Sequence, residues 1–494
     1  IVRRENMEER KGFGTNFGFL MASVGSAVGL GNIWGFPNKM GASGGFTFLI
    51  VYLVLAVLCG FIVMVSELAL GRKTGKGVVS AYQALSKRFK WVGWLGILSP
   101  FFILFFYCAL GGYCIKYTIL NIGDLFHASF GANALAETAV ANGHSLGAEV
   151  FGTFMANPTE AVIFGLIFVA LTMLIVMGGV SGGIEKVCSV GMPALFVMLL
   201  ICIIRACTLE GAVDGLKYMF VPGWAVANGV IDKAPNFFGV LSAAGGQMFF
   251  SLSLGMGIMI TYGSYLDKKE NLQKNALLII IMDTLVALMA GLCVIPGRFA
   301  LDPTGSLGGP KLLFVTMQNV FSRMGPIGPI FGILFYLLVV FAAISSSISL
   351  LEAVVAHFVD NARDAGKGDK RKAYALIAAA AVGVGAVLIC ADSLGEASFT
   401  PWRLLNLPAE SIRTWNDCWL DFFDMLSEGI MMPLGALMMT LMVGWELGPD
   451  VVKDECEASG HAMASYGFYK VCIKYITPLC MILVLYGQIK EFFF

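Results

Sequence analysis

The chain has 494 residues, of which 57% are hydrophobic and only 13% are charged, and its 33 basic residues balance its 33 acidic residues. Soluble domains carry roughly 25% charged residues, so the composition indicates a membrane protein, and the zero net charge gives no support for a nucleic-acid or acidic partner. Apolar runs of roughly 18 or more residues predict an all-α polytopic membrane protein with about eleven transmembrane helices. Their centres lie near residues 29, 57, 105, 169, 198, 252, 286, 343, 382, 433 and 480.

The distribution of Lys and Arg over the loops predicts how the chain lies in the membrane. Residues 72–90 and 363–372 are rich in both, as cytoplasmic loops are, whereas residues 117–163 contain neither and are expected outside. With about eleven spans, the N-terminus is then cytoplasmic and the C-terminus extracellular or periplasmic. We expect the plasma (inner) membrane, and residues 1–11 do not form a cleavable signal because they are charged and lack an apolar core.

The first apolar segment contains residues that a spanning helix normally avoids. Asn32, Pro37 and several glycines fall within a few turns, and each glycine inside a helix costs about 1 kcal/mol relative to alanine. In lipid, backbone groups freed by a break need new partners; cations suit the carbonyls and a carboxylate suits the amides. The pattern indicates either a broken helix that binds ligands or small-residue helix packing through Gly25 and Gly29.

The chain can be divided into two halves of five spans each. The segment that opens the second half, residues 245–257, is again apolar and again interrupted by Gly and Ser. Two broken spans at matching positions indicate an inverted-repeat transporter with a site at the membrane midplane. We expect a cytoplasmic N-terminal segment, a first repeat, an extracellular loop, a second repeat, and a cytoplasmic loop with the eleventh span, at residues 1–16, 17–210, 211–237, 238–446 and 447–494.

Three carboxylates inside spans need a role, because a charge in the membrane is costly. Glu67, near the inner end of the second span, could accept hydrogen bonds from amides freed in the first span, or pair with Arg72. Asp283 lies within the seventh span, where a bound cation would stabilise it. Glu352 lies two turns after a run of serines, and its role stays open.

Hydroxyl groups are the second kind of polar group inside the spans. Ser345, Ser346 and Ser347 are consecutive in the eighth span; such hydroxyls usually bond to their own helix, but beside broken helices they offer neutral oxygens that suit sodium. Tyr107 lies in the middle of the third span, where its phenol needs a partner such as a substrate carboxylate. No nucleophile–base set or phosphate-binding loop stands out, so we do not expect an enzyme.

Five stretches together resemble the neurotransmitter:sodium symporter family, which includes the bacterial leucine transporter (LeuT). They are SAVGLGNIWGFP at 26–37, SELALGR at 66–72, GQMFFSLSLG at 246–255, TYGSY at 261–265 and FAAISSS at 341–347. The resemblance extends from about Arg10 to the last span. It implies a LeuT-like 5+5 inverted repeat with broken first and sixth helices.

The resemblance also implies the binding residues. A first sodium site would use Ala27, Asn32, Ser251, Asp283 and the substrate carboxylate, and a second would use Gly25, Val28, Ala342, Ser345 and Ser346. The substrate would contact Ser26, Ala27, Val28, Leu30, Gly31, Ile103, Tyr107, Phe250, Ser251, Ser253, Met256, Ser347 and Leu350. An apolar wall without a fixed countercharge favours a hydrophobic amino acid.

The gates match the family only in part. Arg10 and Asp360 match the cytoplasmic gate pair, with Tyr265 nearby, and Phe250 would be the lid over the substrate. Gly35 stands where the family usually has the outer-gate arginine, so the acid that we expect in the tenth span, Asp424, lacks that partner. Outer closure would then depend on Phe250 and loop packing, or on a basic residue of the long loop, Arg403 or Arg413.

Two further departures concern the inner plug and the seventh span. Phe13 stands where the family usually has tryptophan. Asp283 stands where many members have asparagine, and Ala287 stands where chloride-dependent members have a serine that binds the anion. We hypothesise that the fixed charge of Asp283 replaces chloride, because sodium in a low dielectric needs a countercharge.

The sequence therefore predicts a sodium-coupled symporter that imports a hydrophobic amino acid, aliphatic or aromatic, by alternating access. It predicts two sodium sites, no organic cofactor and no dependence on chloride. Two alternatives remain open: a sodium-independent exchanger of the same fold, and a membrane sensor that binds an amino acid without moving it.

Overall fold

The computed structural model describes residues 12–304, 309–368, 370–406 and 416–493. These residues form helices joined by short connections and contain no strand. Within this part of the chain, 9 helices are long and apolar enough to cross a membrane, or 10 if one bent pair counts as a single span. Each of them covers one of the span centres expected from the sequence, and the prediction of an all-α polytopic protein is confirmed.

The first half of the chain supplies the spans up to α10. Its helices are α1 (Asn16–Ala27), α2 (Phe36–Ala42), α3 (Phe46–Leu55), α4 (Phe61–Thr74), α6 (Val92–Leu125), α9 (Pro158–Met177) and α10 (Glu185–Cys207). The helices α3 and α4 form one span, joined by the π-helical turn Ala56–Gly60. Short helices connect the spans: α5 (Val78–Leu85), α7 (Ala136–Asn142), α8 (Leu146–Met155), α11 (Ala212–Phe220) and α12 (Trp224–Ala227).

The second half is built in the same way. Its spans contain α13 (Phe237–Ser251), α14 (Ile258–Gly263), α15 (Leu272–Leu301), α18 (Gly328–Asp364), α19 (Arg371–Asp392), α21 (Trp419–Asp424), α22 (Met432–Leu441) and α25 (Thr477–Phe493). A π-helical turn, Met425–Met431, joins α21 to α22. The connecting helices are α16 (Gly309–Lys311), α17 (Met317–Arg323), α20 (Pro401–Leu405), α23 (Asp450–Glu457) and α24 (Tyr466–Val471).

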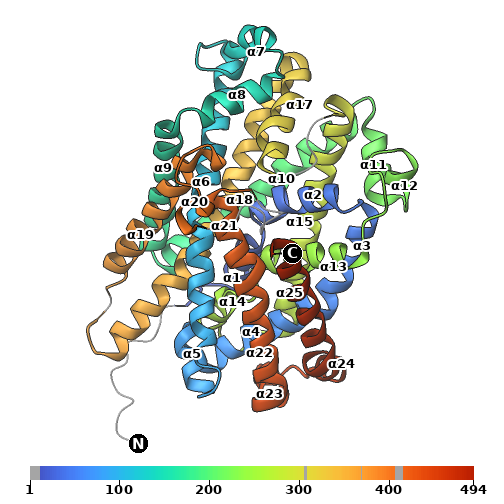
Figure 1. Ribbon diagram of the computed structural model, residues 1–494. Coiled ribbons are helices and arrows are strands. Elements are labelled where there is room, and N and C mark those ends of the chain that lie inside the picture. Colours follow the sequence, from blue (N-terminus) through green and yellow to red (C-terminus); the bar gives the residue numbers. More distant parts are fainter. Residues whose placement is uncertain (1–11, 305–308, 369, 407–415, 494) are drawn as a thin grey trace, which may run out of the picture.

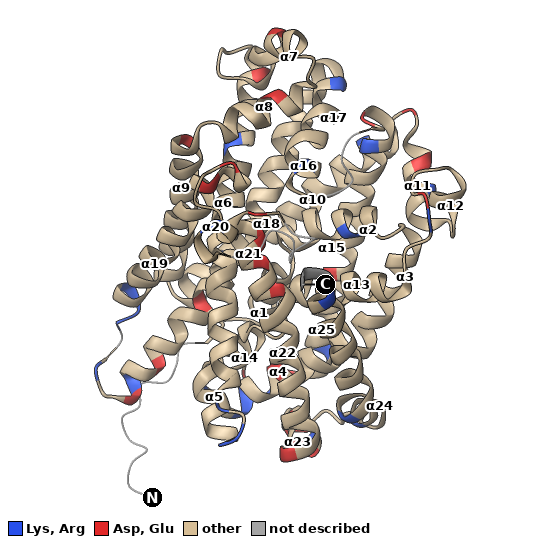
Figure 2. Cartoon of the chain, in the orientation of Figure 1, with Lys and Arg blue, Asp and Glu red and all other residues tan. Residues whose placement is uncertain are grey.

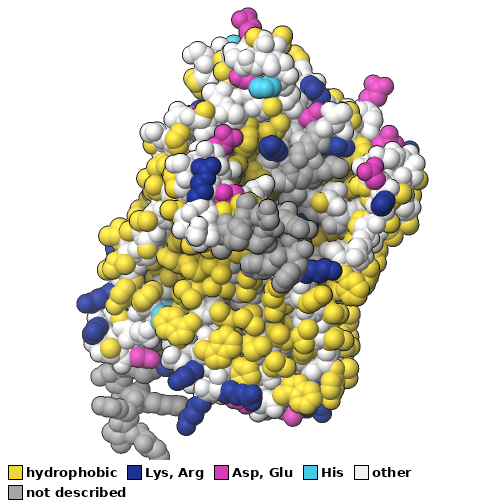
Figure 3. All heavy atoms as spheres, in the orientation of Figure 1, with side chains coloured by type: hydrophobic (Ala, Val, Ile, Leu, Met, Phe, Trp, Pro, Cys, Tyr) yellow, Lys and Arg dark blue, Asp and Glu magenta, His cyan; other side chains and the backbone are white. Residues whose placement is uncertain are grey.

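The molecule has two polar ends and an apolar middle. The helices α7, α8 and α17 lie at one end and α5, α23 and α24 at the other (Figure 1). Acidic and basic residues gather toward these ends, and few lie between them (Figure 2). Hydrophobic side chains form a broad band over the surface between the ends (Figure 3). Such a band matches the hydrocarbon region of a bilayer.

Two spans are interrupted inside this apolar middle. The helices α1 and α2 are bent by 45° at a short break. The helices α13 and α14 are separated by residues 252–257, and neither is long enough to cross alone, which is why the eleventh expected span is not among the long helices. The long helices α6 and α18 pack along each other and hold both breaks at the centre of the bundle.

Candidate substrate and sodium site

The break in the first span leaves two amides that side chains satisfy. The helix α1 ends at Ala27, and Val28 is extended, with φ −77° and ψ 102°. The Gly29 N–H donates to Asn32 Oδ1 at 3.0 Å, and the Leu30 N–H donates to the Tyr107 hydroxyl at 2.8 Å. The unpaired amides that a break in lipid would leave are therefore paired within the protein.

Glycine is required at two positions of this break because other groups approach so closely. A Cβ on Gly29 would lie 2.2 Å from the Tyr107 hydroxyl and 2.3 Å from Ser346 Oγ. A Cβ on Gly31 would lie 2.8 Å from a ring carbon of Phe250. The glycines that weaken the helix thus allow α6, α18 and α13 to approach its backbone.

The freed carbonyls of the first span face the serines of α18. Ser346 Oγ lies 3.2, 3.1 and 3.3 Å from the carbonyl oxygens of Gly25, Ser26 and Val28. Ser345 Oγ lies 3.4 Å from the Val28 oxygen and 2.9 Å from the Ala342 oxygen. The structure thus brings together all residues expected for the second sodium site, with the Ser26 carbonyl in addition. The set consists only of neutral oxygens, which fits sodium.

A second polar cluster surrounds Asp283, which is completely buried on α15. Ser251 Oγ donates to Asp283 Oδ2 at 2.8 Å, and the Tyr52 hydroxyl donates to the same oxygen at 3.3 Å. Asn32 Nδ2 donates to Asp283 Oδ1 at 2.7 Å and to Ser251 Oγ at 3.0 Å. Three of the residues expected for the first sodium site therefore meet here, from three different spans.

The amide of Asn32 faces this cluster with its nitrogen. Its Oδ1 accepts the Gly29 N–H, and its Nδ2 points at Asp283. A cation beside Asp283 needs the amide oxygen, so Asn32 must turn its amide group by half a turn to serve as a ligand. That turn releases the Gly29 N–H and thereby couples the cluster to the break.

Between the two clusters lies a small cavity. Nine of the residues expected to bind substrate line it, namely Ser26, Ala27, Gly31, Ile103, Tyr107, Phe250, Ser253, Met256 and Leu350, together with Gly29 and Ser346. Its volume is about 10 Å³, the space that a single water needs. A larger molecule requires these side chains to move apart.

Four expected substrate residues do not line this cavity. Val28, Leu30 and Ser251 lie beside it and act through their carbonyl, amide or hydroxyl groups described above. Ser347 turns away: its hydroxyl contacts Thr172 on α9 at 2.8 Å. From the triple serine, Ser346 faces the cavity instead.

The break in the sixth span uses a carboxylate. Glu67, buried on α4, accepts the Gly255 N–H at 2.8 Å. The sequence led us to expect Glu67 at the first break or beside Arg72, and the structure corrects both expectations, since Arg72 Nε pairs with Glu455 at 2.8 Å. Gly255 has φ +76°, and a Cβ there would lie 2.3 Å from the Met432 carbonyl oxygen.

Beyond the sixth break, a fully buried carboxylate joins two helices and the turn after α14. Glu352 on α18 accepts two bonds from the Arg371 guanidinium at 2.6 and 2.8 Å and one from the Tyr265 hydroxyl at 2.6 Å. Asp360 Oδ2 accepts the Gly77 N–H at 2.8 Å. The expected gate partner of Asp360, Arg10, lies outside the described residues.

Beyond the first break, an ion pair links the first and tenth expected spans. Lys39 on α2 pairs with Glu428, and Asp424 lies near enough to interact with both of them. A Cβ on Gly35 would lie 2.8 Å from Gln247 Oε1, and Gln247 Nε2 donates to the Gly31 carbonyl at 2.6 Å. Gln247 thus occupies the space beside Gly35, where the family usually has arginine. The basic residue, Lys39, follows Gly35 by four residues.

Sequence reasoning missed Tyr52, Lys39, Gln247 and Glu428. Lys39 carries a usable signal, because it is the only charged residue between Lys11 and Glu67, and a lone charge in a span needs a partner. Tyr52 and Gln247 are polar residues in apolar spans, but nothing in the sequence identifies their partners.

Interrupted helices that turn backbone carbonyls and hydroxyls toward one buried centre are typical of secondary transporters that couple a substrate to a cation. Comparisons with known proteins identify the group. The model of the sodium:neurotransmitter symporter family matches residues 10–133 and 155–400, and this chain belongs to that family.

Two relatives and one solved structure are similar over most of the chain. YhdH, a sodium-dependent transporter of Bacillus subtilis, is 31% identical over 95% of this chain and 96% of that protein. A sodium-dependent transporter of Methanocaldococcus jannaschii is 30% identical over 90% of this chain and 84% of that protein. The crystal structure of MhsT in complex with L-phenylalanine has 31% identity and a TM-score of 0.81, covering 97% of this chain and all of that one. The chain is a multi-pass, sodium-dependent membrane transporter and not an enzyme.

Proposed function

We propose that this sodium-dependent transporter imports a hydrophobic amino acid by alternating access and without chloride. The observation that carries the proposal is the lining of the central cavity, in which no side chain is charged. Ile103, Phe250, Met256 and Leu350 supply its apolar wall. A charged substrate side chain would meet no countercharge there. The MhsT structure, similar over nearly the whole chain, holds L-phenylalanine.

The two ends of the cavity suit the two charged groups of an amino acid. The Leu30 N–H and the Tyr107 hydroxyl, now bonded to each other at 2.8 Å, are donors for a carboxylate at the start of a half-helix. The carbonyl of Ser26 accepts the Ser253 hydroxyl at 2.9 Å, and these two oxygens suit the ammonium group. We infer that the substrate separates both pairs as it enters.

Two sodium ions would bind as co-substrates. The carbonyls and hydroxyls around Ser345 and Ser346 hold one, and Asp283, Ser251, Ala27 and a turned Asn32 hold the other, with the substrate carboxylate completing its shell. Substrate and sodium then raise each other's affinity by the same factor. Each sodium that enters down a potential of 100 mV supplies about 2.3 kcal/mol.

The proposed gates lie on either side of this centre. The Lys39–Glu428 pair closes the outer side above Phe250, in the place where Asp424 was expected to act. Tyr265, bonded to Glu352, and Asp360 close the inner side. We place the protein in the plasma (inner) membrane with a cytoplasmic N-terminus and an external C-terminus.

Uptake of labelled amino acids into proteoliposomes tests the function. Leucine-like or aromatic amino acids should accumulate with an inward sodium gradient, with or without chloride, and should not accumulate when choline replaces sodium. Sodium-independent exchange would replace the proposal by an exchanger. Sodium-dependent binding without uptake would replace it by a sensor.

A further inference from the structure

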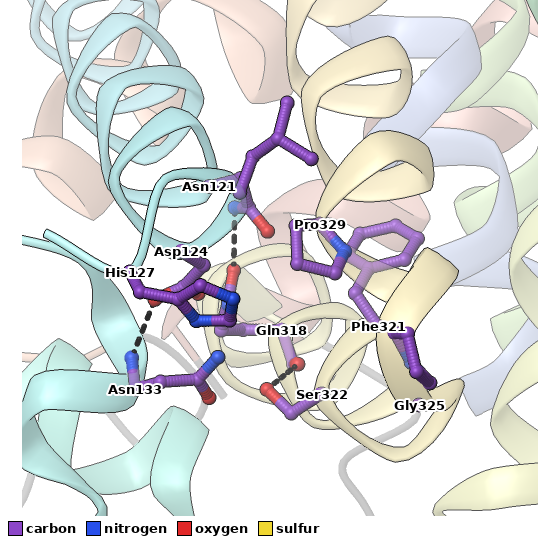
Figure 4. Close-up of a pocket in the computed structure, with 11 residues that line it drawn as sticks. Asn121, Asp124, His127, Asn133, Gln318, Phe321, Ser322, Gly325 and Pro329 are labelled. Carbon is purple, nitrogen blue, oxygen red and sulfur yellow. Dashed lines mark hydrogen bonds between the residues drawn. The ribbon is translucent and has the colours of Figure 1, made fainter.

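A second and larger cavity lies far from the central one, at the end of the molecule that carries α7, α8 and α17. Its volume is about 300 Å³, within the range of small-molecule sites. The end of α6, the turn after it, α17 and the start of α18 line it. In Figure 4, Asp124, His127 and Asn133 lie on one side of Gln318, and Phe321 and Pro329 lie on the other. Segments from two halves of the chain thus form one wall each.

One polar group of this cavity is buried without a partner. The side chain of Gln318 is 1% exposed. Its Oε1 accepts from Asn121 Nδ2 at 3.0 Å, but its Nε2 has no hydrogen-bond partner among the described residues. A buried donor left unpaired costs about 1–3 kcal/mol, so a ligand that offers an acceptor here gains a bond that the protein lacks.

The charge of the cavity favours a cation. Asp124 is 5% exposed, and only its Oδ1 has a described bond, from the Asn133 N–H at 2.7 Å. No Lys or Arg lines the cavity. Phe321 and Pro329 supply apolar surface opposite the carboxylate. The imidazole of His127 and the side-chain amide of Asn133 also line the cavity. The lining thus combines the Asp124 carboxylate, the unpartnered Gln318 Nε2–H, these further polar groups and an apolar wall.

We propose that this cavity binds a small organic amine. Its ammonium group pairs with Asp124, its hydrogen-bond acceptor receives the Gln318 Nε2–H, and its apolar body lies against Phe321. Two sources share this chemistry, the amino acid that the protein carries and an amine that it does not carry.

The position of the cavity gives the ligand an influence on transport. The helix α6 carries Tyr107, and α18 carries Ser345 and Ser346, so both helices that line the cavity also form the central site. The hydrogen bond between Asn121 and Gln318 joins α6 to α17 beside the cavity. A ligand held between Asp124 and Gln318 fixes α6 relative to the segment leading into α18, and thereby acts as a regulator of the central site.

Calorimetric titration of the purified full-length chain in detergent tests the binding, in sodium-free potassium buffer. The probes are leucinol, leucine, and isocaproate, which lacks the ammonium group. Leucinol should bind to the wild type, and isocaproate should not. Asp124→Asn keeps the acceptor for Asn133 and removes the charge, so leucinol affinity should fall about 10- to 100-fold. Ser322→Leu fills the cavity from its rim and should abolish binding.

Glu149→Gln is the matched control, because Glu149 is an acidic residue at the same end whose carboxylate bonds to His144; its leucinol affinity should equal that of the wild type. Asp124-dependent binding of leucine identifies the carried amino acid as the ligand, and binding of leucinol alone identifies a separate amine. Equal leucinol affinity in the wild type and Asp124→Asn, or no binding to the wild type, overturns the proposal. Sodium-driven uptake is measured separately, so a failure of the proposed function would leave this result intact.

Discussion

The two interrupted spans both free backbone groups inside the membrane, and different side chains bond to these groups at each break. At the first break, neutral side chains bond to the freed backbone groups. Ser346 faces three carbonyls, and Tyr107 and Asn32 accept hydrogen bonds from the two amides. At the sixth break, the buried carboxylate of Glu67 accepts the Gly255 amide. Neutral groups can release the backbone to a cation or a carboxylate at small cost, whereas an amide bound by a buried carboxylate stays bound. The backbone groups of the first break are therefore suited to ligand exchange, and the Gly255 amide of the sixth break to holding the fold.

The largest expected effect comes from closing the space at the first break. Gly29→Ala places a methyl group 2.2 Å from the Tyr107 hydroxyl and 2.3 Å from Ser346 Oγ. Overpacking costs about 3 kcal/mol at the upper end of its usual range, so sodium-driven uptake in proteoliposomes should fall about 100-fold. Gly152→Ala, a helical glycine with nothing within 4 Å of the added carbon, should transport normally. Wild-type uptake by Gly29→Ala would show that this approach is not needed.

Removing the charge beside the first break should have the next largest effect. Asp283→Asn removes the negative charge and replaces one of the two oxygens that accept from Ser251 and Asn32 by an amide nitrogen. Uptake without chloride should fall about 10- to 100-fold, the factor that matches a charge-assisted bond, and added chloride should restore part of it. Asp214→Asn, in an exposed ion pair with Lys217, is the control. Unchanged chloride-free uptake would remove Asp283 as the substitute for the anion.

Substitutions at the two breaks should affect different properties, the stability of the fold at the sixth break and sodium affinity at the first. Glu67→Ala leaves the Gly255 N–H unpaired and should lower the free energy of unfolding by about 1–3 kcal/mol, measured by thermal unfolding in detergent. Glu67→Gln keeps an acceptor and should unfold near the wild-type temperature. Ser346→Ala should behave in the opposite way, with weaker sodium binding and little change in unfolding. If Ser346→Ala destabilises as much as Glu67→Ala, the two breaks do not differ in role.

The smallest expected effect concerns the outer pair. Lys39→Met leaves Glu428, whose side chain is 8% exposed, without its cation. Prebound labelled substrate should then dissociate toward the outside a few times faster, about the effect of losing 0.5–1 kcal/mol at a partly exposed pair. Removing both charges, in Lys39→Met with Glu428→Gln, should restore part of the loss. Lys217→Met, in an exposed ion pair on α11, should have no effect. Equal rates in all variants would exclude a gating role.

The fold was predictable because its signals are local and strong. Apolar runs place the spans, and glycines in apolar runs mark the breaks, and both predictions are confirmed by the helix bounds and the family comparison. The second sodium set was named from the family resemblance; the structure places Ser345 and Ser346 beside the first-span carbonyls, and sodium binding there stays a prediction.

The pairing of distant groups was not predictable. The sequence suggested the first break or Arg72 as the partner of Glu67, and only the packing of α4 against α14 places it at Gly255. Lys39 and Glu428 lie on different repeats, and no local pattern connects them. Ser346 and Ser347 point in directions about 100° apart around one helix. This difference decides which of them faces the cavity, and a motif match does not reveal it.

The buried Glu352 holds two bonds of unequal strength at the proposed inner gate. Its bonds to Arg371 join α18 to α19, and its bond to the Tyr265 hydroxyl joins α18 to the turn after α14. If that turn moves away from α18 in the proposed alternating access, the carboxylate keeps its guanidinium. Loss of the phenol bond then costs about 1.5–3 kcal/mol, less than the 3–5 kcal/mol of a broken buried ion pair. This bond alone would shift the balance between closed and open by roughly tenfold or more.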